Sequence, residues 1–412
     1  NQGDTVILEE MVGENLPYGL KGTIRKVDDI GQIHINWENG SSLAIDPKID
    51  KFEVISKQEK ELIQKEENNI NSSFLSFNYN LNNKKIPYPT GTNEKIQANL
   101  DAIKTLLIIE SEKRLARQEE KEILANYVGW GGLPQVFESP ENIKSAFIKE
   151  KAIELKELLT DKEYEMARAS TLNAHYTPNE IISEMYSAIK NFGYNNSIKI
   201  LEPSCGTGNF IGNLPTELLN SKVTGIELDS ITGRIASKLY PNAKIKINGF
   251  EKELLQENSF DLVVGNVPFG EYSIYDKTYN KNNYLIHDYF INKSIELTKP
   301  NGIVAVITSK GTLDKKDDNF RREISKKAEL VGAIRLPNIA FKKLAGTEVT
   351  SDILFFQKLE QEREEVPDWV NTIEVKYENR INNYFTNHPE MILGELDYKT
   401  NRYGRFDLTV NF

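Results

Sequence analysis

The sequence has almost no cysteine and no long apolar run. Its 412 residues include one cysteine, Cys205. This excludes a disulfide framework and a cysteine-rich zinc site, and it favours a reducing compartment. No stretch approaches the roughly 20 apolar residues that a membrane-spanning helix needs, and the start, NQGDTVIL, lacks a signal-peptide pattern. We therefore expect a soluble, cytoplasmic protein with no membrane partner and, since it lacks an initiator methionine, a piece of a longer protein.

A net positive charge is also missing. The formal net charge of −10 argues at first against a nucleic-acid partner. Binding needs only a local basic face, however, so composition leaves the partner open. What the chain does have is a hydrophobic fraction of 39% over 412 residues, which is enough for a large core and favours two or three domains.

The first part of the chain changes character twice. Residues 1–57 contain short period-2 runs separated by Gly, Asp and Asn, with an Asn39-Gly40 hairpin signal, and predict a small all-β barrel of four or five strands. Residues 58–87 are charged and then Asn-rich, which indicates a short exposed helix and a linker. Residues 88–170 are predicted to be helical, in two stretches, the first with an apolar stripe of Leu100, Ile103, Leu106 and Leu107.

The second part of the chain alternates helix and strand. Residues 171–360 contain seven short, apolar and β-branched runs, as strands covered on both faces should be: IKILEP, KVTGIEL, AKIKING, FDLVVGN, GIVAVIT, ELVGAIRL and SDILFFQK. This alternation predicts an α/β fold with a doubly wound, Rossmann-like sheet. Residues 361–412 are mixed and polar and form a C-terminal extension.

A glycine-rich loop is the strongest site signal. In LEPSCGTGNF, Gly206 and Gly208 allow a tight turn at the carboxyl end of a strand, where open α/β sheets bind ligands. The next strand ends in Glu227 and Asp229, about 20 residues on, where a carboxylate can accept hydrogen bonds from a ribose. Ile211 stands where a dinucleotide fingerprint needs its third glycine, and no Walker lysine follows. A nucleoside without a pyrophosphate, such as S-adenosylmethionine, fits best; an unrelated tight turn is the alternative.

Two flanking motifs could also contact this cofactor. In NAHYTPNEII, we read Thr177, Pro178 and Glu180 as the N-cap, first helical position and capping-box glutamate of a helix, whose N-terminus could also bind the cofactor's carboxylate. After the third strand, Phe250 could lie against an adenine ring with Glu251 accepting from its amino group. A core phenylalanine is the equal alternative.

The strand DLVVG ends in Asn266, Val267, Pro268 and Phe269. Here the sequence resembles the amino-methyltransferase family of S-adenosylmethionine-dependent enzymes, whose motif at this place is Asn/Asp/Ser-Pro-Pro-Tyr/Phe. The order AHYTP, EPSCGTGNF and NVPF, with a helical region in front, is similar to the modification subunits of type I restriction systems.

A closer resemblance covers residues 88–360. YVGWGGLP, STLNAHYTP, GNVPFGEY, ITSKGTLDKK and AGTEVTSDILFFQK resemble the methyltransferase segment of large methylase–helicase proteins of conjugative elements and phages. The first 56 residues resemble a small SH3-like module of unknown function.

The resemblance implies methyl transfer to adenine N6 in DNA. The Asn266 side-chain oxygen and the Val267 carbonyl would hold the two N–H groups of the amine, so that its lone pair faces the sulfonium methyl. Phe269 would stack on a base flipped out of the duplex, and the proton would leave to solvent. Val267 replaces the usual first proline, which removes a fixed backbone angle. Asn rather than Ser at position 266 favours adenine N6 over cytosine N4 in this family.

Tyrosines and lysines alternate in the loop YSIYDKTYNKNNY. Aromatic rings stack on bases and lysines meet phosphates, so the loop is a candidate substrate lip, although a merely solvated loop is equally plausible. The pairs Lys315-Lys316, Arg321-Arg322, Lys326-Lys327 and Lys342-Lys343 could line a phosphate face, but an ordinary charged helix surface is favoured. We interpret Trp130 as a packed anchor, and we predict no metal site because no second histidine is suitably spaced from His287.

The motifs give three sets of predicted site residues. The catalytic set is Asn266, Val267, Pro268 and Phe269. Cofactor contacts are predicted for His175, Tyr176, Thr177, Glu202, Pro203, Gly206, Gly208, Phe210, Glu227, Leu228, Phe250, Glu251 and Asn266. Substrate contacts are predicted for Tyr272, Tyr275, Lys277, Tyr279 and Lys281.

The sequence thus predicts an adenine-specific DNA methyltransferase with S-adenosylmethionine as cofactor and DNA as partner. A helicase or specificity module outside this chain is a further possible partner. Two alternatives stay open: an N-methyltransferase acting on RNA or on protein glutamine, and a catalytically silent DNA-binding or antirestriction module of a mobile element.

Overall fold

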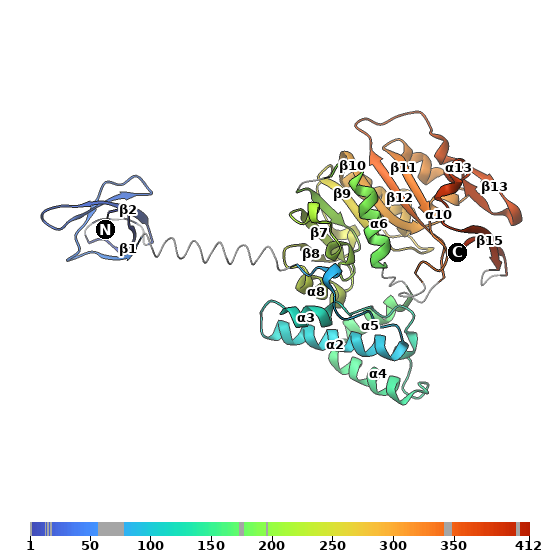
Figure 1. The fold of residues 1–412 in the computed structure, drawn as a ribbon, viewed down its shortest axis with the longest axis horizontal. Coiled ribbons are helices and arrows are strands. Elements are labelled where there is room, and N and C mark those ends of the chain that lie inside the picture. The colour runs from blue at the N-terminus through green and yellow to red at the C-terminus, as the bar shows by residue number, and fades with distance from the viewer. Residues whose placement is uncertain are drawn as a thin grey trace. The chain divides into compact units, whose positions relative to one another are not determined.

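The computed structural model describes residues 2–12, 14, 16, 19–56, 78–172, 177–194, 197–341, 348–400 and 404–412. The chain forms two compact units, Asn1–Ser76 and Phe77–Phe412 (Figure 1). Most of the segment predicted as a short helix and linker lies outside the described residues. Across the described ranges, no helix combines the length and apolar character needed to cross a bilayer.

The first unit is a five-stranded antiparallel sheet with the order β4-β3-β2-β1-β5. Its strands are β1 (Thr5–Glu10), β2 (Lys21–Val27), β3 (Ile33–Trp37), β4 (Ala44–Ile45) and β5 (Lys51–Ile55). The Asn39-Gly40 turn forms as predicted, with Gly40 at φ 78° and the Asn39 side chain accepting from Ser41 N. The described strands leave β4 and β5 as free edges, so the sheet is an open half-barrel and not a closed barrel.

A helical region opens the second unit. Its elements are η1 (Leu81–Asn83), α2 (Thr92–Ser111), α3 (Gln118–Leu124), η2 (Pro134–Phe137), α4 (Ala146–Leu158), α5 (Asp161–Ala169) and η3 (Ser170–Leu172). Each of the two predicted helical stretches is therefore split in two. Lys113, at φ 51°, interrupts the first, and a capping box at Thr160 and Glu163 starts a new helix in the second. The predicted stripe on α2 is buried except for Leu107, which is partly buried.

All seven predicted strands join one sheet, with the order β11-β12-β10-β9-β6-β7-β8. They are β6 (Lys199–Glu202), β7 (Lys222–Glu227), β8 (Lys244–Ile247), β9 (Phe260–Asn266), β10 (Thr298–Ser309), β11 (Ala328–Arg335) and β12 (Ser351–Lys358). β6 to β10 pair in parallel, whereas β12 is antiparallel to both β10 and β11. The predicted Rossmann-like α/β fold is confirmed. Strand order reverses beside β6, and open α/β sheets bind ligands at such a switch point.

Helices cover both faces of the sheet. They are α6 (Asn179–Lys190), α7 (Asn209–Gly212), η4 (Thr216–Leu218), α8 (Ser230–Leu239), η5 (Phe250–Lys252), α9 (Ile286–Leu297), α10 (Gly311–Asp314) and α11 (Asn319–Ser325). Alternate residues of β9 enter opposite cores: Leu262 and Val264 pack with α6, α8 and the helical region, while Val263 packs with α9 and α11. In Figure 1, α2 to α5 gather on the side of the sheet that carries α8.

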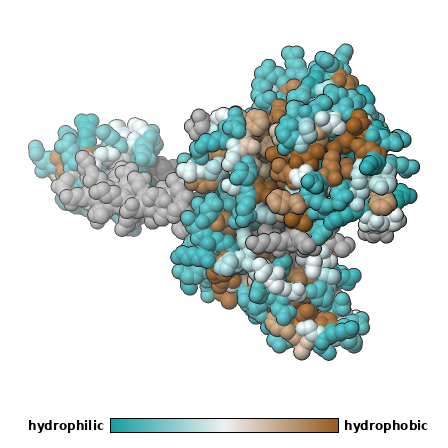
Figure 2. All heavy atoms as spheres, turned by 45° about the vertical axis from the view of Figure 1, so that its right-hand side comes forward, coloured by the Kyte–Doolittle hydropathy of each residue, from teal (hydrophilic) through white to brown (hydrophobic). Residues whose placement is uncertain are grey.

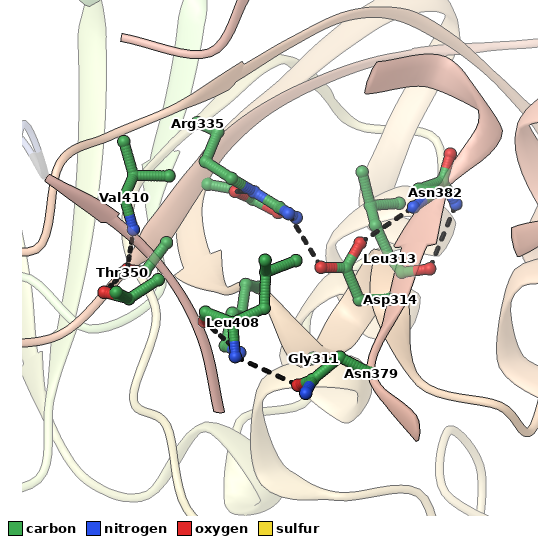
Figure 3. A network of polar contacts seen from close by, with 12 residues as sticks. Gly311, Leu313, Asp314, Arg335, Thr350, Asn379, Asn382, Leu408 and Val410 are labelled. Atoms are coloured by element: carbon green, nitrogen blue, oxygen red, sulfur yellow. Dashed lines mark hydrogen bonds and ion pairs between the residues drawn. The ribbon is translucent and has the colours of Figure 1, made fainter. Parts of the chain in front are cut away.

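The C-terminal extension packs onto the sheet. It contains η6 (Asp368–Val370), β13 (Thr372–Glu374), η7 (Lys376–Glu378), β14 (Arg380–Asn382), α13 (Asn383–Asn387), η8 (Pro389–Met391), β15 (Glu395–Thr400) and β16 (Phe406–Asn411). The buried Arg335 guanidinium donates to Asp352 at 2.8 and 2.9 Å and to Asp314 at 2.7 Å, and Asp314 accepts from Asn382 N at 3.0 Å (Figure 3). Because each buried charge is paired, this network fastens the extension to the sheet.

The surface of the second unit is not uniform. In Figure 2, hydrophobic residues, in brown, gather on one face of this unit and are bordered by hydrophilic residues in teal. Gatherings of this kind mark binding grooves or partner surfaces in soluble proteins.

Candidate functional site: a cavity at the switch point of the sheet

A cavity of about 430 Å³ opens at the carboxyl ends of the central strands. Its size is within the range of about 300–1,000 Å³ that is usual for small-molecule sites. Glu202 from the end of β6, Glu227 from the end of β7 and Asn266 from the end of β9 all line it. Three motifs that are far apart in the sequence therefore meet in one place.

The glycine loop is shaped by close packing. Gly206 and Gly208 have φ angles of 56° and 85°, which favour glycine. A Cβ atom on Gly208 would lie 2.5 Å from Tyr240 Cε2, so no larger residue fits there. Gly206 lines the cavity, and its N–H donates to Glu227 Oε2 at 2.8 Å. Gly208 is not among the lining residues, and its role in the structure is to let the chain pass Tyr240 into α7.

Glu227 is held in place by the backbone. Its carboxylate accepts from Gly206 N and from Asp229 N, both at 2.8 Å. Burial raises the pKa of Glu227 to about 7. Asp229 has a different task, because its side chain accepts from Thr232 N at 2.7 Å and caps the start of α8.

Glu202 is a second carboxyl group of the cavity. It is buried, and among the described residues its Oε2 atom has no hydrogen-bond partner. Burial, reinforced by the neighbouring Glu227, raises the pKa of Glu202 well above its ordinary value. An orphaned polar atom in a cavity wall marks a place where a polar ligand group can bind.

The side chain of Asn266 points toward Thr177. Asn266 Nδ2 donates to Thr177 Oγ1 at 3.2 Å, an orientation assigned from the hydrogen-bond network. Our prediction that Thr177 is an N-cap is wrong: α6 begins at Asn179 after Pro178, which has ψ 141°, and no side chain caps it. The hydroxyl of Thr177 instead positions the asparagine amide across the site.

The peptide bond between Asn266 and Val267 is fixed from both sides. Ser204 Oγ donates to the Asn266 carbonyl at 2.8 Å, and Val267 N donates to the Ile307 carbonyl of β10 at 3.1 Å. A proline at position 267 could not make the second bond, because it has no N–H. The sheet therefore supplies here the restraint that the usual proline ring would provide.

The aromatic side of the cavity combines Phe250, Pro268, Phe269 and Tyr272. Phe250 is buried, with its ring 4.9 Å from that of Phe290, while Phe269 is half-buried. Tyr272 is the one predicted lip residue that lines the cavity. Lys277 and Lys281 are exposed, Tyr275 is 85% exposed, and Tyr279 donates from its hydroxyl to Glu257.

The predicted lip is a firmly held loop. Asp276 Oδ1 accepts from the backbone of Thr278 and Tyr279 at 2.9 and 3.0 Å. Lys293, buried in α9, donates to the Phe250 carbonyl at 2.6 Å and to Asp276 Oδ2 at 3.3 Å. Sequence reasoning missed Lys293, although a lysine inside the apolar run YFINKSIEL was a signal. It ties the loop to the cavity wall.

Most predicted cofactor residues lie around the cavity. The lining includes Thr177, Glu202, Pro203, Gly206, Phe210, Glu227, Leu228, Phe250, Glu251 and Asn266, together with Val267, Pro268 and Phe269. Gly208, Tyr275, Lys277, Tyr279 and Lys281 are not among the lining residues. His175 and Tyr176 lie outside the described residues.

The basic pairs do not form one phosphate face. Arg321 is fully buried and donates to the Val370 carbonyl at 2.8 Å, so its assignment to a surface is wrong. Arg322 and Lys326 are exposed but pair with Asp318 and Glu323. Lys342 and Lys343 lie outside the described residues. These contacts fit the charged helix surface that we favoured.

The family comparison agrees with this geometry. Residues 142–340 match the family described as "Eco57I restriction-modification methylase". These residues are therefore similar to a methylase domain of that type. Residues 1–55 match a "Domain of unknown function (DUF4314)", and their SH3-like character stays a prediction.

Two curated relatives belong to viruses. "Defense against restriction protein B" of Escherichia phage P1 is 29% identical over 58% of this chain and 9% of that protein. "Modification methylase CviBIII" of Paramecium bursaria Chlorella virus NC1A is 31% identical over 23% of this chain and 25% of that protein. The chain thus spans at most a quarter of the length of either relative. The predicted resemblance to methylases and to a phage antirestriction protein is confirmed, whereas the link to conjugative elements stays a prediction.

Two solved structures are similar to this chain at low identity. One is described as a class I S-adenosylmethionine-dependent methyltransferase from Listeria monocytogenes, with 17% identity and a TM-score of 0.40 over 66% of this chain and 92% of that one. The other is a modification subunit of a type I restriction enzyme from Vibrio vulnificus, with 16% identity and a TM-score of 0.40 over 64% of this chain and 67% of that one.

Proposed function

We propose that this chain is an S-adenosylmethionine-dependent DNA methyltransferase that acts on adenine N6. The observation that carries the proposal is the meeting of the glycine loop, Glu227 and the Asn266–Phe269 segment in one cavity. A methylase domain is already indicated by the family match of residues 142–340.

The cavity residues fit S-adenosylmethionine. Glu227 offers carboxylate oxygens to ribose hydroxyls, and Phe250 offers an aromatic face beside them for the adenine ring. The orphaned Oε2 of Glu202 needs a polar partner, which the ammonium of the cofactor's amino acid would provide. When bound, the cofactor supplies an electrophilic methyl group on its sulfonium.

The Asn266–Phe269 segment fits an amine whose lone pair is delocalised into a ring. The Asn266 amide and the Val267 carbonyl can accept from its two N–H groups and turn the lone pair toward the methyl group. Thr177, Ser204 and Ile307 hold this segment by the hydrogen bonds described above, so alignment is set before the substrate arrives. Asn266 cannot act as a base, so the proton leaves to solvent.

The aromatic wall fits a flat base. Phe269, with Pro268 beside it, can stack on a base taken out of the duplex, and the exposed Tyr275 with Lys277 can meet the adjacent strand. DNA is favoured over RNA or protein glutamine because the matching family is described as a restriction-modification methylase and the chlorella-virus relative is named a modification methylase. By the same argument, the phage relative named for defense against restriction suggests an antirestriction role.

Transfer of a labelled methyl group tests the substrate class. The full chain would be incubated with [methyl-³H]S-adenosylmethionine and, separately, with duplex DNA, single-stranded DNA, RNA and a protein mixture. We expect label in DNA, and a loss of about a hundredfold or more in Asn266→Ala. The matched control is Asn191→Ala, at an exposed asparagine after α6, which should retain the rate. Label in RNA or protein alone would move the assignment to those substrates. Cofactor binding without any transfer would favour the silent module.

A further inference from the structure

The YVGWGGLP segment of the helical region reaches the cavity. Tyr127 and Gly129 from this segment line the same cavity as Glu227 and the glycine loop. Three residues at the end of α5 and the start of η3 join them: Met166, Ala169 and Ser170. The cavity therefore has one wall from the α/β sheet and a second wall from the helical region.

The turn that carries Tyr127 is rigid. The buried Asn99 of α2 accepts from Val128 N at 2.9 Å and donates to the Gly129 carbonyl at 2.6 Å. Gly129 has φ 68°, which explains why glycine stands there. Trp130 is buried edge-on to Phe137, with 5.5 Å between ring centroids, and is the packed anchor predicted from the sequence.

The second wall is fastened to the helix that follows Glu227. Arg234 of α8 donates to Glu110 of α2 through Nε at 2.9 Å, and it also pairs with Glu163 of α5. The side chains of all three residues are less than a third exposed. Since Asp229, which lines the cavity, caps the start of α8, the same helix connects the ribose end of the cavity to the helical region.

Tyr127 faces this ribose end. It is buried, and it lines the cavity together with Glu227, Asp229 and Thr232. Burial, reinforced by Asp229, raises the pKa of the Tyr127 hydroxyl well above its ordinary value, so the hydroxyl keeps its proton at every physiological pH. A protonated phenol is both a donor and an acceptor, which suits a ribose hydroxyl that also donates to a carboxylate.

We propose that this turn of the helical region is the second wall of the cofactor site, and that Tyr127 binds the ribose of the cofactor through its hydroxyl. The inference rests on the proposed use of S-adenosylmethionine and adds a binding residue from outside the α/β domain. Met166 adds apolar cover over the same nucleoside. Cofactor binding then also holds the helical region against the sheet.

Calorimetry with S-adenosylhomocysteine tests the role of the hydroxyl. Tyr127→Phe removes one oxygen, and we expect the Kd of the full chain to rise about three- to tenfold, as for the loss of one hydrogen bond. The matched control is Tyr164→Phe, on α5, whose ring packs on Phe137 and does not line the cavity. Its Kd should equal that of the unchanged chain. 5′-Methylthioadenosine, which keeps the ribose and lacks the amino acid, should lose the same factor in Tyr127→Phe.

Hydrogen exchange on the unchanged chain needs no substitution, so a folding defect in a variant cannot affect the result. Amides of residues 126–132 should exchange more slowly when S-adenosylhomocysteine is added. If the unchanged chain binds the ligand, while Tyr127→Phe binds equally well and residues 126–132 gain no protection, this inference is overturned and the proposed function stands. If the unchanged chain binds no cofactor at all, both the proposed function and this inference are wrong.

Discussion

At the scale of single residues, the peptide between Asn266 and Val267 shows how one position can be restrained in two ways. Proline would fix the backbone angle by its ring, whereas Val267 uses its N–H to bond Ile307 O at 3.1 Å. Ser204 Oγ holds the other side of the same peptide at 2.8 Å. The residue that departs from the family motif is therefore compensated by the sheet.

Replacing Val267 with proline should accordingly harm this protein. The change removes the bond to Ile307 O and leaves a buried carbonyl unpaired, at a cost of about 1–3 kcal/mol in the free energy of unfolding. Urea unfolding measures the cost, with Val267→Ala, which keeps the N–H, as the control. If Val267→Pro were as stable as Val267→Ala, the hydrogen bond to Ile307 would contribute nothing to the free energy of unfolding.

Glu227 should make cofactor affinity depend on pH. Burial raises its pKa to about 7, so in the free chain the carboxyl group is largely protonated below pH 7 and ionised above it. Ribose hydroxyls donate to the ionised form, so binding releases a proton below that pKa. Affinity should rise by up to about tenfold per pH unit from pH 6 to about 7 and then level off.

Calorimetry at pH values from 6 to 8 measures this dependence. Glu227→Gln keeps the shape of the side chain without the titration, so its Kd should be weaker and nearly constant across the window. Glu202 is another carboxyl group of the cavity, and burial raises its pKa well above the ordinary value. A pH dependence that persisted unchanged in Glu227→Gln would be assigned to Glu202.

At the scale of secondary-structure elements, α8 joins the two walls of the cavity. Arg234→Ala removes the contacts with Glu110 and Glu163, and we expect a loss of about 1–3 kcal/mol in the free energy of unfolding. Cofactor binding should weaken as well, because the second wall is loosened. Arg168→Ala is the matched control: its pair with Glu165 is more than half exposed and should contribute less than about 1 kcal/mol. If both variants lost the same free energy of unfolding, the contacts of Arg234 on α8 would not be what joins the two walls.

Secondary-structure elements could be predicted from the sequence where neighbouring residues alone determine them. The seven strands were predicted because each is a short β-branched run bounded by turn residues, and all seven form. The breaks within the helical stretches, at Lys113 and Thr160, were hidden because no glycine or proline stands beside them and helix-favouring residues such as Glu, Lys and Leu flank both. Thr177 was misread as an N-cap, since the local pattern of a cap does not show that its hydroxyl bonds Asn266 instead.

At the scale of the whole molecule, most contacts between segments far apart in the chain could not be predicted from the sequence. The glycine loop, the acidic strand end and the Asn266–Phe269 segment could be placed together because parallel strands end at one edge of a sheet. No such rule brings Tyr127 or Met166 to that edge, because their position depends on how the helical region packs against α8. The substrate lip stays a prediction: Tyr272 lines the cavity, whereas Asp276 and Lys293 hold the following part of the loop by contacts that the sequence pattern does not reveal.

The two units should be separable. Residues 1–76 have their own core, which includes Val6, Ile24 and Trp37, and residues 77–412 form a compact unit by themselves. A chain that begins at residue 77 should therefore bind S-adenosylhomocysteine with the Kd of the full chain and transfer methyl groups to DNA at the same rate. Calorimetry and label transfer compare the two chains. A weaker cofactor Kd in the shorter chain would show that the first unit contributes to the site.

We propose above all that the Asn266–Phe269 segment directs a methyl group to adenine N6 in DNA. The most direct measurement digests unmethylated duplex DNA to nucleosides after incubation with the chain and S-adenosylmethionine, and identifies the methylated base by mass spectrometry. We expect N6-methyladenine from the unchanged chain and none from Asn266→Ala. N4-methylcytosine in its place, or N6-methyladenine that persists in Asn266→Ala, would contradict it.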